Sequence, residues 1–310
     1  MLTCDNGFVT TRDSNSTNPT AHVTDTALIF EGGGMRASYT SAVVSLLLDQ
    51  GISFDWVGGI SAGASNTANY LSRDKQRSYR SFVEFAADPN FGNMRTWMAG
   101  KGLFNAPYIY EEAGLANAAL PYDWDTYQSN PTQFAVGAFE METGKMQYWG
   151  REDVAELHDL MVRVRASSSL PVVMPPVTLG GKTYVDGALG PTGGFALDAA
   201  RAAGYRKFFV VMTRGRDYVK PPQSMNQLYR RIFRKYPAVV NGIMHRHHRY
   251  NQTRAELFEL ERRGEAYLFL PENMGVSNSE RDVRKLRESY ELGALQARYE
   301  LPAWKEFLEL

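Results

Sequence analysis

Two strand–loop–helix units follow each other near the start of the chain, and they constrain the fold more than any other feature of the sequence. The stretch "TALIFEGGGMRASYTSAVVSLLLDQG", residues 26–51, predicts a buried strand, a triple-glycine loop and a helix that ends at Gly51. The stretch "DWVGGISAGASNTANYL", residues 55–71, repeats the pattern with Ser61 at the turn from strand to helix. Consecutive units of this kind build a mostly parallel sheet covered by helices. We therefore expect an α/β fold with a central, mostly parallel sheet flanked by helices.

Ser61 is the central serine of a Gly-x-Ser-x-Gly pattern, between Gly59 and Gly63. At a sharp turn between strand and helix, such a serine hydroxyl stands exposed above the sheet, beside the N-terminus of the helix. The free N–H groups and the dipole of the helix favour negative charge at that place. The position suits a nucleophile, and an N-cap of the helix is the plainer alternative.

Gly32, Gly33 and Gly34 form a loop at the start of the first predicted helix. A loop of this kind lets a ligand approach the backbone closely, and its N–H groups can hold a phosphate or an oxyanion. Neither Gly-x-Gly-x-x-Gly nor the Gly-Lys-Ser/Thr ending of a P-loop is present, which argues against a nucleotide. Acyl transfer through Ser61 requires preformed donors for its tetrahedral intermediate, so we favour an oxyanion hole. The alternative is a glycine loop that only eases the packing of strand on helix.

The base that would take the proton of Ser61 has two candidates. One is a histidine of "HRHHRY", at His245, His247 or His248, which would satisfy the chain order of the α/β-hydrolases. The neighbouring arginines of that run would disfavour the imidazolium that forms when a histidine accepts a proton. The other candidate is Asp186 in "YVDGALGP", which follows an apolar strand and precedes two small residues. Aspartate at a strand end is also a common turn residue.

Three blocks, EGGGMR, GISAG and "RASSSLPVVMPPVTLGGKTYVDG", occur in the order that resembles the patatin-like phospholipases, over about residues 26–213. In that family the glycine-rich loop is the oxyanion hole, the elbow serine is the nucleophile and an Asp-Gly aspartate is the base. The resemblance thus implies Ser61 as nucleophile and Asp186 as base. It matches the oxyanion loop to Gly32, Gly33, Gly34 and Met35, followed by Arg36 as the usual arginine of the loop. Ala37 stands where the family often has a glycine, a departure that concerns the local shape of the loop.

The resemblance implies a serine acyl hydrolase that cleaves lipid esters with a Ser61–Asp186 dyad, through an acyl-enzyme. Arg36 would brace the glycine loop or pair with an anionic headgroup. This chemistry requires no metal and no cofactor, and the sequence has no obvious calcium loop or zinc cluster. Two alternatives stay open. One is a Ser–His–Asp esterase that uses a histidine of residues 245–248, and the other is a non-catalytic lipid-binding protein.

The chain of 310 residues, 44% hydrophobic, suffices for one large core with an extension. We expect three parts. Residues 1–25 would be a flexible tail, residues 26–217 the patatin-like catalytic domain, and residues 218–310 a mainly helical C-terminal extension. Within these parts we expect hairpins about Thr143-Gly144 and Gly180-Gly181, a late strand at 265–271, and a loop at 88–102.

The charges are balanced in number, 34 basic against 34 acidic, but not in place. No acidic residue occurs between Asp217 and Glu256, and the Lys and Arg residues of this stretch predict contact of residues 218–255 with anionic lipid surfaces. A solvated helix face is the alternative, and we expect no nucleic-acid partner.

Three features of the sequence bear on location. The single Cys4 excludes a disulfide framework and permits a reducing compartment. Residues 1–26 lack the basic start and apolar core of a signal peptide. No stretch reaches the roughly 18 consecutive apolar residues of a membrane span. We therefore expect a cytoplasmic protein that is at most peripheral to the membrane.

Overall fold

The computed structural model describes residues 19–310, so most of the tail predicted for residues 1–25 lies outside the described residues. Its last part instead forms strand β1 (Ala21–Val23), which pairs in parallel with β3 (Ile52–Phe54) in a small two-stranded sheet. The side chain of Val23 is buried in the hydrophobic core. The prediction of a tail therefore does not hold for this segment, because its backbone pairs and its side chain packs.

Eight further strands form the main sheet. They are β2 (Thr26–Phe30), β4 (Trp56–Ile60), β5 (Gln133–Glu140), β6 (Met146–Trp149), β7 (Val177–Leu179), β8 (Lys182–Asp186), β9 (Lys207–Val211) and β10 (Ala266–Phe269). Their order is β10-β9-β2-β4-β5-β8-β7, and β6 pairs with β5. The first five strands of this order run parallel, whereas β6, β7 and β8 are antiparallel to their neighbours. The expected central, mostly parallel sheet is thus confirmed.

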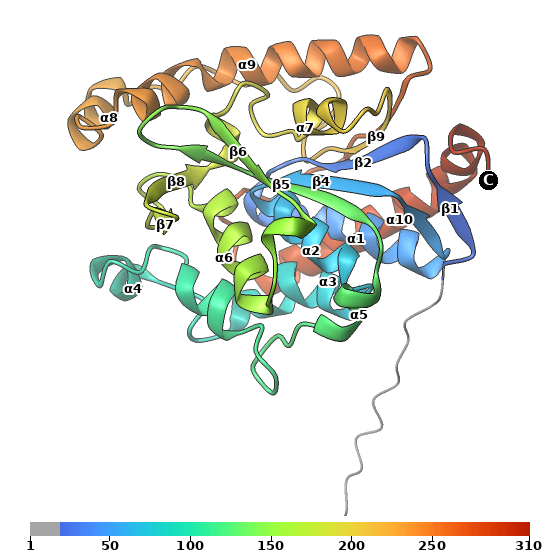
Figure 1. Ribbon diagram of the computed structural model, residues 1–310, viewed down its shortest axis with the longest axis horizontal. Helices are drawn as coiled ribbons and strands as arrows, with labels where there is room; N and C mark the ends of the chain where they lie inside the picture. Colours follow the sequence, from blue (N-terminus) through green and yellow to red (C-terminus); the bar gives the residue numbers. More distant parts are fainter. Residues whose placement is uncertain (1–18) are drawn as a thin grey trace, which may run out of the picture.

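Helices cover both faces of this sheet (Figure 1). They are α1 (Ala37–Asp49), α2 (Ala62–Leu71), α3 (Lys75–Phe82), α4 (Met94–Met98), α5 (Trp124–Ser129), α6 (Leu157–Ser168), α7 (Leu197–Ala202), α8 (Asn226–Ile232), α9 (Pro237–Arg262) and α10 (Val283–Phe307). Short 3-10 or π turns are η1 (Gly34–Arg36), η2 (Glu84–Ala87), η3 (Tyr108–Glu112), η4 (Arg151–Asp153) and η5 (Gly187–Leu189). Within residues 19–310, no helix combines the length and the apolar character that crossing a bilayer requires.

Strand β2 lies between two hydrophobic clusters because its side chains alternate between the faces of the sheet. Leu28 and Phe30 pack in the cluster that includes α1, α2, α6 and α10. Ala27 and Ile29 pack in the cluster that includes α7 and α9. All five residues of β2 are buried, which explains why the strand is a continuous apolar run rather than an alternating one.

The C-terminal residues are part of the same packed body. Strand β10 pairs in parallel with β9 and forms an edge of the main sheet, as the predicted late strand at 265–271 suggested. Helix α10 packs on α1, where Ser38 Oγ donates a hydrogen bond to Ser289 Oγ at 3.0 Å. A Cβ on Gly293 would clash with the backbone of Tyr39, so the two helices approach closely at that point. The mainly helical segment 218–310 therefore completes the sheet and covers α1.

Most of the predicted local elements are confirmed. The hairpins about Thr143-Gly144 and Gly180-Gly181 connect β5 to β6 and β7 to β8. The loop predicted at 88–102 differs in one respect, because it contains the short helix α4, whose first turn is closed by a capping box.

Candidate active site

The candidate site lies at the carboxyl ends of the parallel strands, where open α/β sheets bind ligands. The glycine loop follows β2, Ser61 follows β4, Arg214 comes after β9 and Asn278 comes after β10. These residues and Asp186 line one cavity of about 390 Å³. The volume falls in the range of small-molecule pockets.

Ser61 has an unusual backbone conformation, and the glycines two positions before and after it, Gly59 and Gly63, leave room for the tight turn. Its φ is 59° and its ψ is −126°, and the side chain stands at the start of α2. A Cβ on Gly59 would clash with the backbone of Gly63, and a Cβ on Gly63 would clash with the carbonyl of Phe30. The Gly-x-Ser-x-Gly pattern therefore has a steric cause, because the turn brings three backbone segments together around the serine.

Strand β5 aligns Ser61 with Asp186. The last residue of β4, Ile60, is paired with Gly137, and Asp186 at the end of β8 is paired with the next residue, Ala138. Because β6 occupies the other edge of β5 at these positions, β4 and β8 share one edge and meet end to end. Ser61 Oγ donates a hydrogen bond to Asp186 Oδ2 at 2.7 Å. The pairing register of β4 and β8 on β5 thus brings into contact two residues that lie 125 positions apart in the sequence.

The carboxyl group of Asp186 is 3% exposed. Burial raises its pKa above the ordinary value, and the positive charge of Arg246 opposes this rise. The N–H of Ala188, which donates to Oδ1 at 2.8 Å, and the hydroxyl of Ser61 also lower the pKa of this carboxyl. Because burial has the largest effect, Asp186 holds a proton more strongly than an exposed aspartate does.

The C-terminal end of α6 and the residue after it hold both residues of this pair in place. The N–H of Ser61 donates to Ser167 Oγ at 2.9 Å, and Ser167 Oγ donates in turn to the carbonyl of Gly137 at 2.6 Å. The N–H of Asp186 donates to the carbonyl of Ser169 at 3.0 Å. The sequence "ASSSLP" carried only a family resemblance, and the structure adds what Ser167 and Ser169 bind.

The glycine loop contributes fewer free donors than the sequence suggested. The N–H of Gly32 donates to the carbonyl of Gly194 at 3.1 Å, and the N–H of Met35 donates to the carbonyl of Asn278 at 3.0 Å. Among residues 19–310, the N–H groups of Gly33 and Gly34 have no hydrogen-bond acceptor. Gly34 has a φ of +57°, and a Cβ there would also clash with Asn278, so glycine is required at this position.

Ala62 adds a donor that the sequence analysis did not name. It is the first residue of α2, so its N–H lacks an acceptor within the helix. It directly follows Ser61, the position whose N–H completes the oxyanion hole in other folds with this elbow. The signal was therefore present in the sequence, in the place of Ala62 relative to the serine.

The histidine alternative has no support in the geometry. All five histidines belong to the part of the chain that the structure describes, and none of them lines the cavity that contains Ser61 and Asp186. His247 lines a neighbouring cavity and stacks on His248, with ring centroids 4.3 Å apart. His245 Nδ1 lies 3.0 Å from the carbonyl oxygen of Asn241.

Arg36 is 9% exposed and faces the cavity. The pKa of its guanidinium is lowered to about 10, mainly by burial and then by the nearby positive charge of Arg214. Its guanidinium makes no hydrogen bond to the glycine loop or to any other residue of the 19–310 range, and its buried Nε has no partner. A role as a brace of the loop is therefore not supported.

Two further cations, Lys220 and Arg246, line the same cavity, although the sequence did not single them out as site residues.

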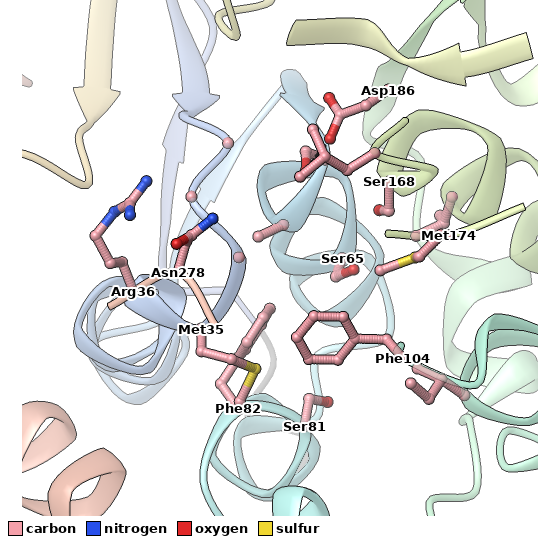
Figure 2. Close-up of a pocket in the computed structure, with 18 of the residues that line it drawn as sticks. Met35, Arg36, Ser65, Ser81, Phe82, Phe104, Ser168, Met174, Asp186 and Asn278 are labelled. Carbon is pink, nitrogen blue, oxygen red and sulfur yellow. Dashed lines mark hydrogen bonds between the residues drawn. The ribbon is translucent and has the colours of Figure 1, made fainter. Parts of the chain in front are cut away.

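The rest of the cavity wall is largely apolar. In Figure 2, Asp186 lies at one end of the view, and the side chains of Phe82, Phe104 and Met35 converge toward the other. Aromatic and methionine side chains dominate this part; they include Met35, Phe82, Phe85, Phe91, Phe104 and Met174. The cavity therefore places a serine–aspartate pair beside a space suited to a hydrocarbon chain.

Comparisons with known proteins place the chain in a family. A family model described as patatin-like phospholipase matches residues 28–196, and one described as a domain of unknown function (DUF6363) matches residues 236–309. The comparison with curated protein sequences gives no match. Among solved structures, VipD from Legionella pneumophila is similar with a TM-score of 0.46 and 10% identity, over 92% of this chain and 67% of that chain. The patatin match covers more than half of the chain and contains Ser61 and Asp186, and the chain therefore belongs to the patatin-like phospholipase family.

Proposed function

We propose that the protein is a serine acyl hydrolase that cleaves carboxylic esters of lipids. The observation that carries this proposal is the 2.7 Å hydrogen bond from Ser61 Oγ to Asp186 Oδ2. Membership of a phospholipase family and the apolar wall of the cavity support a lipid as the substrate.

In the first step, Ser61 Oγ attacks the ester carbonyl carbon while Asp186 accepts the hydroxyl proton. The tetrahedral intermediate places negative charge on the former carbonyl oxygen. We assign its stabilisation to the N–H groups of Gly33, Gly34 and Ala62, because none of them has an acceptor within residues 19–310. When the intermediate collapses, the bond to the alcohol breaks, Asp186 returns its proton to the leaving oxygen, and an acyl-enzyme remains.

In the second step, water attacks the acyl carbon and Asp186 accepts its proton. The intermediate again places its charge at the free N–H groups. Its collapse breaks the bond between the acyl carbon and Ser61 Oγ, and the proton on Asp186 returns to that oxygen. The products are a carboxylic acid and the unmodified enzyme. A buried carboxylate with a raised pKa is a better acceptor for these protons than an exposed one.

A fluorophosphonate probe and three variants test the proposal. The probe should label the protein and fail to label Ser61→Ala, because only an activated serine reacts readily. Asp186→Asn keeps the size of the side chain and removes its basicity, so we expect turnover to fall by at least about a hundredfold. The double variant should be scarcely worse than either single one, since the two residues act as a unit.

The matched control replaces His245, His247 and His248 together by Gln, and circular dichroism checks its fold. Turnover should stay within a few-fold of that of the unmodified protein. A folded but inactive triple variant, with Asp186→Asn still turning over, would establish the histidine esterase instead. A protein that binds lipids but is never labelled at Ser61 would be the non-catalytic alternative.

A further inference from the structure

We propose that the cavity contains an anion subsite, formed by Arg36, Arg214, Lys220 and Arg246, which binds the phosphate group of an acyl ester. As a statement about a substrate this rests on the proposed function, whereas the binding of the anion does not depend on turnover.

Four separate segments bring these cations to one place. Arg36 ends η1, Arg214 follows β9, Lys220 lies in the loop before α8, and Arg246 lies in α9. All four line the cavity that also contains Ser61. They also act on one another, since the charges of Arg246, Arg36 and Arg214 all oppose the protonation of Lys220.

The positive charges of this cluster are not neutralised by the protein. Within the described residues none of the four side chains forms an ion pair, and the Nε atoms of its three arginines are buried without a partner. Glu31, a carboxylate outside the dyad that acts on Lys220 and Arg36, already accepts hydrogen bonds from the N–H of Thr213 at 2.5 Å and from the hydroxyl of Tyr250 at 2.7 Å. Because charge that is at least partly buried and has no counterion is unfavourable, the cluster favours an anionic ligand.

Two aromatic rings hold two of the four cations without forming an ion pair. The guanidinium of Arg214 lies 4.2 Å from the ring centroid of Tyr218. Lys220 Nζ lies 5.9 Å from the same centroid and 4.9 Å from that of Tyr250. A cation over an aromatic face is attracted to the ring, and the ring itself carries no negative charge that would neutralise it.

The chemistry of the cavity favours phosphate on the alcohol side of the ester. An ester bound at Ser61 has an acyl arm and an alcohol arm, and the apolar wall suits the acyl arm. The cations then remain for the alcohol arm. Arginine guanidinium groups match the oxygens of a phosphate in bidentate geometry, and three of the four cations are arginines.

The first experiment measures binding to the Ser61→Ala protein, which cannot turn over an ester through this serine. The ligands are 1-oleoylglycerol, its phosphate monoester with the same chain, and inorganic sulfate, which carries a constant charge. We expect the phosphate ester to bind at least about tenfold more tightly than oleoylglycerol, the effect of one charge-assisted contact. Adding Arg214→Gln and Arg246→Gln should bring the ratio of the two affinities close to one.

The matched control is Arg206→Gln. Arg206 is exposed and precedes β9, whereas Arg214 follows the same strand at its other end. The control should keep the full preference for the phosphate ester, and thermal melting of every variant checks its fold.

The outcomes separate the two proposals. Equal binding of oleoylglycerol and its phosphate ester to Ser61→Ala would overturn the subsite, whatever the protein hydrolyses. Tighter binding of the phosphate ester, without hydrolysis of either lipid by the unmodified protein, would leave the subsite standing and overturn the proposed function. Sulfate that binds as tightly as the phosphate ester would assign the cluster to a free anion and overturn its role in holding a lipid headgroup.

A second experiment uses the titration of Lys220. Burial lowers the pKa of its ammonium to about 7, with Arg246 as the next cause, while Glu31 opposes the shift. Sulfate affinity of the Ser61→Ala protein should therefore fall as the pH rises above about 7, and Lys220→Arg should keep the affinity to higher pH. His247 also lies near Lys220, in the neighbouring cavity, so His247→Gln is the control and should retain the pH dependence. A pH dependence that survives Lys220→Arg would remove Lys220 from the subsite.

Discussion

At the scale of single residues, Asp186 combines deep burial with a proposed role that requires negative charge. The sheet register holds its carboxyl against Ser61, and Ala188, Ser61 and the positive charge of Arg246 stabilise the charged form. Burial still dominates and raises the pKa of the group. The proposed proton acceptor thus destabilises the folded state locally at neutral pH.

We therefore expect Asp186→Asn to stabilise the folded protein relative to the unmodified chain, by an amount that increases with pH. Because the folded-state pKa of Asp186 lies above the unfolded-state value, protonation stabilises the fold at low pH, and this contribution is lost as the pH rises through the folded-state pKa. The difference in Tm between Asp186→Asn and the unmodified protein should therefore grow in favour of the variant as the pH rises from about 4, near the ordinary pKa of an aspartate, through the folded-state pKa. Calorimetric scans across this window measure it, and a constant difference would contradict it.

We also expect activity to be independent of divalent metal. In the proposed mechanism, the Ser61–Asp186 pair and the N–H groups of Gly33, Gly34 and Ala62 supply both the nucleophile and the stabilisation of the oxyanion. Turnover of a lipid ester should be the same in buffer and after exhaustive treatment with a chelator. Loss of turnover that added calcium restores would show that the assignment is incomplete.

At the scale of elements, the close contact of α2 with β2 sets the position of the nucleophile. The backbone of Gly63 in α2 lies against the carbonyl of Phe30, the last residue of β2. The glycine loop starts two residues later, at Gly32. One contact therefore fixes both the distance from Ser61 to the loop and the packing of the helix.

Gly63→Ala should disturb this contact and the activity together. The added methyl group meets backbone rather than a flexible side chain, so we expect the free energy of unfolding to fall by about 1–3 kcal/mol. Displacement of Ser61 from the N–H donors should lower turnover by about a hundredfold. Gly275→Ala is the control, because a Cβ at Gly275 meets open space. Denaturant unfolding and kinetics of both variants test the prediction, which unchanged stability of Gly63→Ala would refute.

The elements also show which parts of the site a sequence can predict. Ser61, Asp186 and the glycine loop were identified because each lies in a local pattern with a mechanical cause. Asn278 and Lys220 have no such pattern. They reach the cavity only through the pairing of β10 with β9 and the packing of α9, which join segments far apart in the chain. Strand β1 was missed for a related reason, since three residues carry too short a pattern without their partner β3.

At the scale of the whole molecule, one side combines exposed apolar and basic side chains. Helices α4 and α8 both lie on the left of the view in Figure 1. In α4, Trp97 is 45% exposed and Met98 is 71% exposed. Trp97 Nε1 donates to the carbonyl of Val172, next to the cavity wall at Val173.

The exposed basic residues near α8 are Arg230, Arg231, Arg234 and Lys235. Lys220 and Arg246 of the same basic stretch face the cavity instead.

We expect this side to contact anionic lipid surfaces. Each basic residue near such a surface contributes about 1 kcal/mol, so replacing Arg230, Arg231, Arg234 and Lys235 together by Gln should abolish salt-sensitive binding to vesicles that contain phosphatidylserine. Trp97→Ser should weaken binding at high salt, where apolar contact remains. Tyr299→Ser in α10, at a residue that is 82% exposed, is the control. Co-sedimentation that none of these changes affects would exclude this side.

The division of the cavity between separate stretches of chain has a consequence for inheritance. The apolar wall comes mainly from residues between Phe82 and Met174, whereas three of the four cations lie between Arg214 and Arg246. Ser61 and Asp186 both precede Arg214 in the chain. A genetic crossover in the short interval between Asp186 and Arg214 would therefore transmit most of the apolar wall and the Ser61–Asp186 pair from one parent and three of the four cations from the other. Under the proposed function, such a crossover would combine the acyl-chain preference of one parent with the headgroup preference of the other.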